Sequence, residues 1–259
     1  MSSGSSYQAP CAKIEVMDVQ IQGKNIHYEA RGKGRPLLLV HGWGGSAQSL
    51  EKLATILSAD FQTIVVDLPG FGTSDNPDPT WGVEEYANLL AKLIDNLKLK
   101  NVIYFGHSFG GSLGVQLAVT KPELIDTLIL CAASYHRTGR SSSAARKLKR
   151  ILPIPAPLKR LAYRIFFPKS ELYKLPALES SFRRIVTTDL TQELSQIAQN
   201  TLILWGARDT YTPVENARAA KELIKNSTLK VFDDLGHGLP LYQPELVAAE
   251  IENFVNKKI

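Results

Sequence analysis

The stretch Gly106-His107-Ser108-Phe109-Gly110 decides how the chain folds around it. It directly follows the apolar run 101–105 and directly precedes residues 111–119, which have a helix-like pattern. Where a strand turns sharply into a helix, two backbones come close together, and glycine two residues before and two after the serine leaves room for that approach. Ser108 is therefore expected at a helix N-terminus, where the peptide dipoles favour a developing negative charge.

His237 is the predicted base that would activate Ser108. A serine hydroxyl is a weak nucleophile at neutral pH, so the hypothesis requires a histidine and an acid that both follow Ser108 in the chain. Two histidines have that position. His136 opens a very basic segment and is expected to be a solvated loop residue. His237 ends a β-like run between Gly236 and Gly238, which suits a ring that projects from a loop.

Asp209 is the predicted acid that orients His237. It follows the apolar run 201–205, predicted as a buried strand, and precedes Pro213 near the start of the next helix. A turn or helix-capping aspartate is the structural alternative at this position. Asp233 and Asp234 are rivals, but both lie too near His237 along the chain to reach its Nδ1 while the ring faces Ser108.

Two backbone amides are predicted to form an oxyanion hole. One belongs to Phe109, directly after the nucleophile. The other belongs to Trp43, in the glycine-rich turn 41–45 that follows the apolar run 36–40. The alternative is that these glycines only make the turn tight. The position of the turn, one strand before the loop of Asp67, favours the functional interpretation.

With these motifs in place, the chain resembles the α/β-hydrolase family, in the branch with a serine nucleophile and a cap insertion. The blocks that carry the resemblance follow the family's order and spacing: His41–Gly44, Asp67–Ser74, Gly106–Gly111, Trp205–Asp209 and Gly236–His237. The resemblance implies a mostly parallel eight-stranded α/β sheet with helices on both faces, a small helical cap, and catalytic loops at the carboxyl ends of the strands.

The block at residues 67–74 is similar to that of epoxide hydrolases, haloalkane dehalogenases and carbon-carbon bond hydrolases. The first two of these branches use an aspartate as the nucleophile. Because this chain has Ser108 at that position, both of those chemistries are disfavoured.

The pattern along the chain independently indicates an α/β fold. Strands are predicted at residues 13–20, 24–31, 36–40, 62–67, 101–105, 127–131, 201–205 and 229–232, and helices notably at 83–97 and 243–256. Such alternation predicts a parallel sheet. A chain of 259 residues that is 44% hydrophobic can bury a sizeable core, so residues 13–259 are expected to form a single domain. Residues 1–12 are rich in Ser and Gly, do not resemble a signal peptide, and are expected to be disordered.

Residues 136–188 interrupt this alternation, and the family inserts its cap at this place. In residues 158–166 the apolar side chains fall at helical spacing, which predicts a short helix whose apolar face packs on the main domain, lines the pocket, or both. Pro153, Pro155 and Pro157 would form a stiff connector before it.

The same segment makes the protein basic. Residues 136–188 contain 13 Lys and Arg against 2 Asp and Glu, whereas the rest of the chain contains 17 against 23. One explanation of this charge is a solvated lid surface. The equally weighted alternative is that the cluster Arg146, Lys147, Lys149 and Arg150 attracts anionic substrates or makes weak contact with an anionic membrane surface. No nucleic-acid-binding module accompanies the charge, so no nucleic-acid partner is expected.

No cofactor or metal is expected, since the histidines and cysteines show no ligand spacing. Cys11 and Cys131 are expected to be free thiols in a reducing cytoplasm, the predicted location. No apolar run approaches the roughly 18 residues that a membrane span requires.

Together these residues predict a serine hydrolase that cleaves a small-molecule carboxylic ester through an acyl-enzyme on Ser108. The alternatives are a carbon-carbon bond hydrolase of ring-cleavage products, a hydrolase of small amides or lactones, a hydroxynitrile lyase, and a ligand receptor on the same fold. Acyl length, alcohol identity and oligomeric state stay open at this stage.

Overall fold

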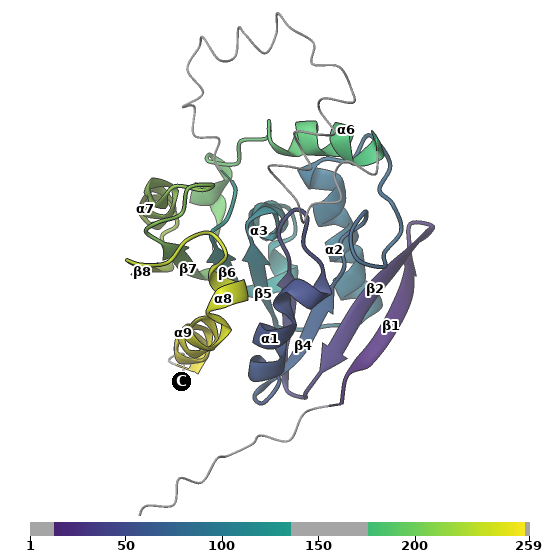
Figure 1. Ribbon diagram of the computed structural model, residues 1–259, viewed down its shortest axis with the longest axis horizontal. Coiled ribbons are helices and arrows are strands. Elements are labelled where there is room, and N and C mark those ends of the chain that lie inside the picture. The colour runs from purple at the N-terminus through teal and green to yellow at the C-terminus, as the bar shows by residue number, and fades with distance from the viewer. Residues whose placement is uncertain (1–12, 136–175, 257–259) are drawn as a thin grey trace, which may run out of the picture.

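The computed structural model describes residues 13–135 and 176–256, which build one sheet with the strand order β1-β2-β4-β3-β5-β6-β7-β8 (Figure 1). The strands are β1 (Glu15–Ile21), β2 (Lys24–Arg31), β3 (Arg35–Val40), β4 (Phe61–Val66), β5 (Val102–His107), β6 (Ile125–Cys131), β7 (Asn200–Gly206) and β8 (Ser227–Phe232). β2 pairs antiparallel with β1 and β4, and all other neighbours are parallel. The mostly parallel eight-stranded sheet predicted from the sequence is confirmed.

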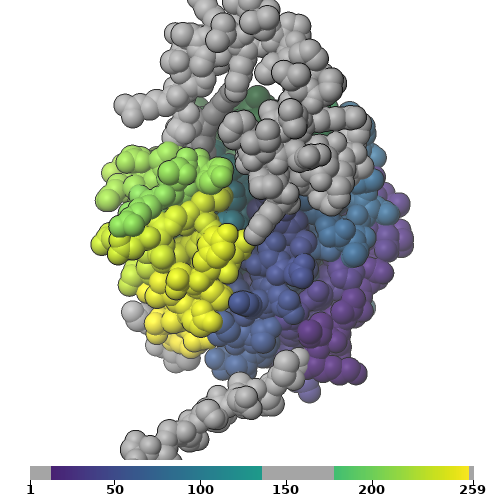
Figure 2. Space-filling model, in the orientation of Figure 1, coloured from purple at the N-terminus to yellow at the C-terminus, as the bar shows by residue number. Residues whose placement is uncertain are grey.

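Helices cover both faces of the sheet. They are α1 (Ala47–Leu57), α2 (Val83–Asn96), α3 (Phe109–Thr120), α6 (Pro176–Ile185), α7 (Val214–Leu223), α8 (Leu239–Tyr242), α9 (Pro244–Asn256) and the 3-10 helices η1 (Pro122–Leu124) and η3 (Glu193–Gln196). Helices α1, α8 and α9 pack on one face, and α2, α3 and α7 on the other (Figure 1). Figure 2 shows the C-terminal segment of α8 and α9 beside α1. Among the described residues, no helix combines the length and apolarity that crossing a bilayer requires.

The alternation of side chains along β3 shows how the two cores form. Leu37 and Leu39 join the core under α1 and α9, whereas Leu38 and Val40 join the core under α2 and α3. A parallel strand that is buried on both faces has a continuous apolar sequence. The uninterrupted apolar run at residues 36–40 is therefore typical of a central strand.

The predicted strands differ from the observed ones by at most two residues at either end. Strands β5 and β7 run past their predicted ends at residues 105 and 205. The extra residues pair with the neighbouring strand, since His107 lies opposite Cys131 and Gly206 opposite Phe232. Histidine and glycine are weak strand formers, so only the tertiary pairing extends the strands.

Several predictions fall outside the described residues: the N-terminal segment 1–12, His136, the proline connector, the helix at 158–166 and the basic cluster 146–150. Helix α6 falls within the range expected for the cap. It lies near the upper end of α2 in Figure 1, and a Cβ built on Gly70 would come within 2.4 Å of Leu178 Cδ2 on α6. Cys131, at the end of β6, is a free and buried cysteine, and burial raises the pKa of its thiol.

Asp67, at the end of β4, ties together two segments beside the site. It is 3% exposed. Its Oδ1 accepts a hydrogen bond from the amide of Ala47 at 2.6 Å, and its Oδ2 accepts one from the amide of Thr73 at 2.9 Å. Gly72 has φ +55°, and a Cβ there would lie 1.8 Å from Asp67 Oδ2, so this turn requires glycine.

We expect Asp67→Ala to lower the free energy of unfolding by about 2–4 kcal/mol, because two amides lose a charged, buried acceptor. Urea denaturation followed by tryptophan fluorescence measures the change. Asp60→Ala is the matched control: Asp60 is exposed, and its loss should change stability by less than about 0.5 kcal/mol. Equal effects of the two substitutions would show that Asp67 does not hold these segments together.

Candidate active site

Ser108 is held in a strained backbone conformation between β5 and α3. Its φ is 51° and its ψ is −111°, a region that residues other than glycine rarely adopt. The flanking glycines make the turn possible. A Cβ on Gly106 would lie 2.3 Å from the carbonyl oxygen of Gly110, and a Cβ on Gly110 would lie 2.3 Å from the carbonyl oxygen of Val40.

Hydrogen bonds on both sides fix this conformation. The amide of Ser108 donates to the carbonyl of Cys131 at 3.0 Å, and the amide of Ser134 donates to the carbonyl of Ser108 at 3.0 Å. The hydroxyl of Tyr104 donates to the carbonyl of Gly110 at 2.8 Å. The end of β6 and a buried tyrosine thus hold the turn that presents the Ser108 side chain.

The structure brings Ser108, His237 and Asp209 into one chain of hydrogen bonds. His237 Nε2 lies 3.0 Å from Ser108 Oγ, and His237 Nδ1 lies 2.8 Å from Asp209 Oδ2. The three residues follow β5, β8 and β7, respectively. Ser108 is half-buried, the side chain of His237 is 21% exposed, and that of Asp209 is fully buried. Burial therefore increases along these hydrogen bonds from the serine to the carboxylate.

Asp209 is surrounded by donors. Its Oδ1 accepts the amides of Tyr211 at 2.8 Å and Thr212 at 2.9 Å, and its Oδ2 accepts the Thr212 hydroxyl at 2.7 Å. Burial opposes ionisation of this carboxyl, but the hydrogen bonds from His237 and Thr212 and the attraction of His237 outweigh it and lower the pKa of Asp209. The carboxylate is therefore ionised at neutral pH.

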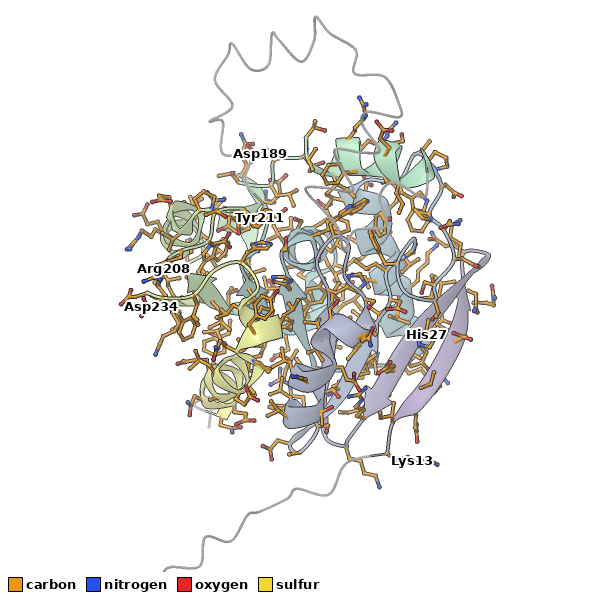
Figure 3. The ribbon with its side chains drawn as sticks, viewed as in Figure 1. Lys13, His27, Asp189, Arg208, Tyr211 and Asp234 are labelled. Carbon is orange, nitrogen blue, oxygen red and sulfur yellow. The ribbon has the colours of Figure 1, made fainter. Side chains whose placement is uncertain are left out.

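The rival acids point elsewhere. Asp234 forms an ion pair with Arg208 at the edge of the molecule (Figure 3), where their side chains are 79% and 70% exposed. Asp233 is also exposed. Neither aspartate is bonded to His237, whose Nδ1 lies against Asp209 and Thr212.

The two residues predicted to supply the oxyanion-hole amides lie in segments that adjoin Ser108. Phe109 follows it directly as the first residue of α3. The turn of Trp43 packs against the serine, since a Cβ on Gly42 would lie 3.1 Å from Ser108 Cβ. Within the described part of the chain, neither amide donates a hydrogen bond to another group. The role of these two amides as an oxyanion hole stays a prediction.

An aromatic wall borders this side of the site. The ring of Trp43 packs edge-on against Phe71 and Phe109, with centroid distances of 4.9 and 5.5 Å. The ring of Phe182, on α6, lies 5.3 Å from that of Trp43. The aromatic wall therefore joins the turn of Trp43 to α3 and to α6, and Trp43 and Phe182 are its half-buried members.

Sequence reasoning missed residues that contact the site through their side chains. Thr212 donates a hydrogen bond to Asp209. Tyr211, labelled in Figure 3, is 67% exposed, and its ring lies 5.1 Å from that of His237. His41 Nδ1 bonds to the carbonyl of Gly42 at 2.8 Å. His107, which bonds to the backbone of His237, stands inside the motif that reveals Ser108, and its position before the serine was the available signal.

Among residues 13–135 and 176–256, no three His, Cys, Asp or Glu side chains gather as metal ligands would. The expectation that the protein needs no cofactor stays a prediction.

A comparison with models of known protein families covers the same part of the chain. The model of the alpha/beta hydrolase family matches residues 37–250, which include Ser108, Asp209 and His237. The chain belongs to the α/β-hydrolase family. Both the family predicted from the sequence motifs and its fold are thereby confirmed.

Relatives within the α/β-hydrolase family differ in what they act on. The chain is 27% identical to the pimeloyl-[acyl-carrier protein] methyl ester esterase of Legionella pneumophila (strain Paris), covering 89% of this chain and 99% of the relative. It is 28% identical to the 2-hydroxy-6-oxo-2,4-heptadienoate hydrolase of Pseudomonas putida, covering 82% and 86%. Among solved structures, a membrane phospholipase A described as a bacterial virulence factor superposes with a TM-score of 0.79 at 25% identity, covering 94% and 86%.

The lowered pKa of Asp209 predicts how stability depends on pH. Its folded-state pKa lies below the ordinary value of about 3.9, so ionised Asp209 stabilises the fold above about pH 4, and this contribution is lost as the pH falls through the folded-state pKa. We expect the difference in free energy of unfolding between wild type and Asp209→Asn to shrink from about pH 5 to pH 3. Urea denaturation at each pH measures it. If the difference in free energy of unfolding between the two proteins grew as the pH fell, Asp209 would not be ionised in the folded state with a lowered pKa.

Proposed function

We propose that this protein is a serine hydrolase that cleaves carboxylic esters with Ser108 as the nucleophile. The observation that carries the proposal is the pair of hydrogen bonds that link Ser108 Oγ to His237 and His237 to Asp209, at 3.0 and 2.8 Å. Nucleophile, base and orienting acid need this order and these distances. The strained turn at Ser108 supports the same role, because strain of this kind persists where the surrounding structure imposes it.

In the acylation step, Ser108 Oγ attacks the carbonyl carbon of the ester while His237 Nε2 takes the hydroxyl proton. The π electrons of the carbonyl move onto its oxygen, which the amides of Trp43 and Phe109 stabilise. When the carbonyl re-forms, the bond to the alcohol oxygen breaks. His237 passes its proton to that oxygen, and the alcohol leaves an acyl-enzyme behind.

Deacylation repeats these events with water as the nucleophile. His237 takes a proton from the water as the oxygen attacks the acyl carbon, and the same amides stabilise the second oxyanion. Collapse releases the carboxylic acid, and the proton on His237 returns to Ser108. Throughout both steps, ionised Asp209 holds Nδ1–H of His237 and stabilises the imidazolium.

The aromatic wall indicates that the acyl part of the substrate is apolar. We expect a carbonyl oxygen bound at the Trp43 amide to bring the substituents of its carbon close to the half-buried residues Trp43 and Phe182. Apolar surface removed from water there contributes about 25 cal/mol per Å², so an apolar acyl chain is favoured. The similarity to a methyl ester esterase supports ester cleavage.

The second candidate is hydrolysis of a carbon-carbon bond next to a carbonyl, as in ring-cleavage products. The similarity to 2-hydroxy-6-oxo-2,4-heptadienoate hydrolase favours it. The two reactions differ in the atom that must be protonated on the leaving group, oxygen or carbon. Aryl esters of graded acyl length, assayed in parallel with a dienoate ring-cleavage product, separate them. A ligand receptor on this fold would turn over neither substrate.

We expect Ser108→Ala to lower kcat for ester hydrolysis by at least about three orders of magnitude, since the residual rate would come from the oxyanion hole and binding alone. The fold should persist, because the change deletes one hydroxyl and leaves no large cavity. Hydrolysis of aryl esters and thermal unfolding measure the two effects.

A fluorophosphonate provides the control for that experiment. It should label wild type on Ser108 and leave Ser108→Ala unlabelled, as shown by peptide mass spectrometry. If Ser108→Ala keeps a tenth of the wild-type rate, or if label appears on another residue, the nucleophile is misassigned.

We expect Asp209→Asn to lower kcat by about 10⁴-fold, because the amide stabilises the wrong imidazole tautomer and cannot balance the imidazolium. Asp234→Asn is the matched control, since Asp234 lies at the surface in its pair with Arg208. Its kcat should stay within about two-fold of wild type, as for a surface substitution away from the site. If Asp234→Asn proved the more damaging change, Asp209 would not be the acid.

A further inference from the structure

His107 lies between the proposed base and the proposed oxyanion turn. Its Nε2 lies 2.8 Å from the carbonyl oxygen of His237. Because a carbonyl only accepts, Nε2 must carry the proton and donate. The ring centroids of the two histidines are 5.1 Å apart. On the other side of the ring, a Cβ built on Gly42 would lie 3.2 Å from His107 Nδ1, so the imidazole also packs against the turn that leads to Trp43.

The charge state of His107 suits a structural donor. The residue is 7% exposed. Burial, with a smaller contribution from His237, lowers the pKa of His107 to about 3, although the carbonyl of His237 and the carboxylate of Asp209 act in the opposite direction. The ring is therefore neutral at the pH of the reaction, with its proton on the nitrogen that faces His237.

The loop of His237 has few other backbone anchors. Strand β8 ends at Phe232 and α8 begins at Leu239. The carbonyl of Leu235 accepts a hydrogen bond from the amide of Arg208 at 2.9 Å, which ties this loop to the segment that follows β7. Within the described residues, His107 is the one hydrogen-bond partner of the His237 backbone.

We propose that His107 is a positioning residue: its Nε2–H holds the backbone of His237 so that the imidazole stays within hydrogen-bond distance of Ser108. This inference rests on the proposed serine-hydrolase function and adds a residue to it. His107 does not touch the reacting atoms itself. It acts by fixing the loop that carries the base to the strand that carries the nucleophile.

The size of the expected effects separates positioning from plain stabilisation. A neutral hydrogen bond contributes only about 1 kcal/mol to folding. A displacement of about 1 Å at a catalytic group costs about 100-fold in rate. Loss of this bond should therefore lower kcat far more than it lowers stability, and KM should change little, since the His107 side chain is buried.

The experiment compares three substitutions in the full-length protein. His107→Gln keeps an N–H donor at about the position of Nε2. His107→Asn has a shorter side chain, whose N–H donor does not reach the His237 carbonyl, and His107→Leu has no donor. Each variant is assayed for kcat and KM on an aryl ester, for its fluorophosphonate reaction rate, and for its melting temperature. Active-site titration corrects kcat for the folded fraction. His27→Leu is the matched control, a histidine of β2 whose ring bonds to exposed Asp18.

We expect kcat and the fluorophosphonate rate to fall roughly 10- to 100-fold in the Leu and Asn variants. KM should stay within about two-fold, and the Gln variant should recover most of the rate, as follows from a role confined to the transition state. His27→Leu should behave as wild type.

Two outcomes overturn the inference on His107 while the proposed function stands: wild-type kcat in the Asn variant, or an equal loss in the Gln and Asn variants. If the Leu variant does not fold, the comparison of Gln with Asn decides. A wild-type protein that neither cleaves esters nor reacts with the fluorophosphonate overturns the proposed function, and the role of His107 with it.

Discussion

The left-handed backbone of Ser108 is the constraint on which the rest of the site depends. Holding a residue other than glycine in this region costs about 1–3 kcal/mol, and the surrounding structure must supply that energy. It does so through bonds from Ser108 to the end of β6 and through Gly106 and Gly110, which allow β5, α3 and β3 to approach within reach of one another. The serine hydroxyl is thereby presented at the N-terminus of α3.

Parallel pairing explains why residues far apart in the sequence meet at Ser108. Strands β5, β6, β7 and β8 run in the same direction, so their carboxyl ends reach one edge of the sheet, where ligand sites of such sheets lie. A second close approach brings the loops of Asp209 and His237 together. A Cβ on Gly206 would lie 2.2 Å from the carbonyl oxygen of Leu235, so only glycine lets the loop of Asp209 lie against the loop of His237.

What the sequence predicted well follows from local rules. The glycine spacing around Ser108, the buried runs at residues 36–40 and 201–205, and the short separation that disfavours Asp233 and Asp234 are all properties of neighbouring residues. Contacts made across the fold were not predictable in this way. The donor of His107 meets a carbonyl 130 positions away, and Phe182 reaches Trp43 from a helix that lies far away in the sequence. The ends of β5 and β7 were missed for the same reason.

The neutral state of the neighbouring histidines matters for the chemistry proposed here. During acylation His237 must become an imidazolium, and a second positive charge at 5.1 Å, the distance to the ring of His107, would oppose it by about 3 kcal/mol at an effective dielectric constant of about 20. Burial removes that obstacle, since it lowers the pKa of both His107 and His41. Each of these rings instead hydrogen-bonds to a backbone carbonyl beside the site. The fold thus places three histidines close to Ser108 but leaves only His237, bonded to an ionised carboxylate, suited to carry the proton.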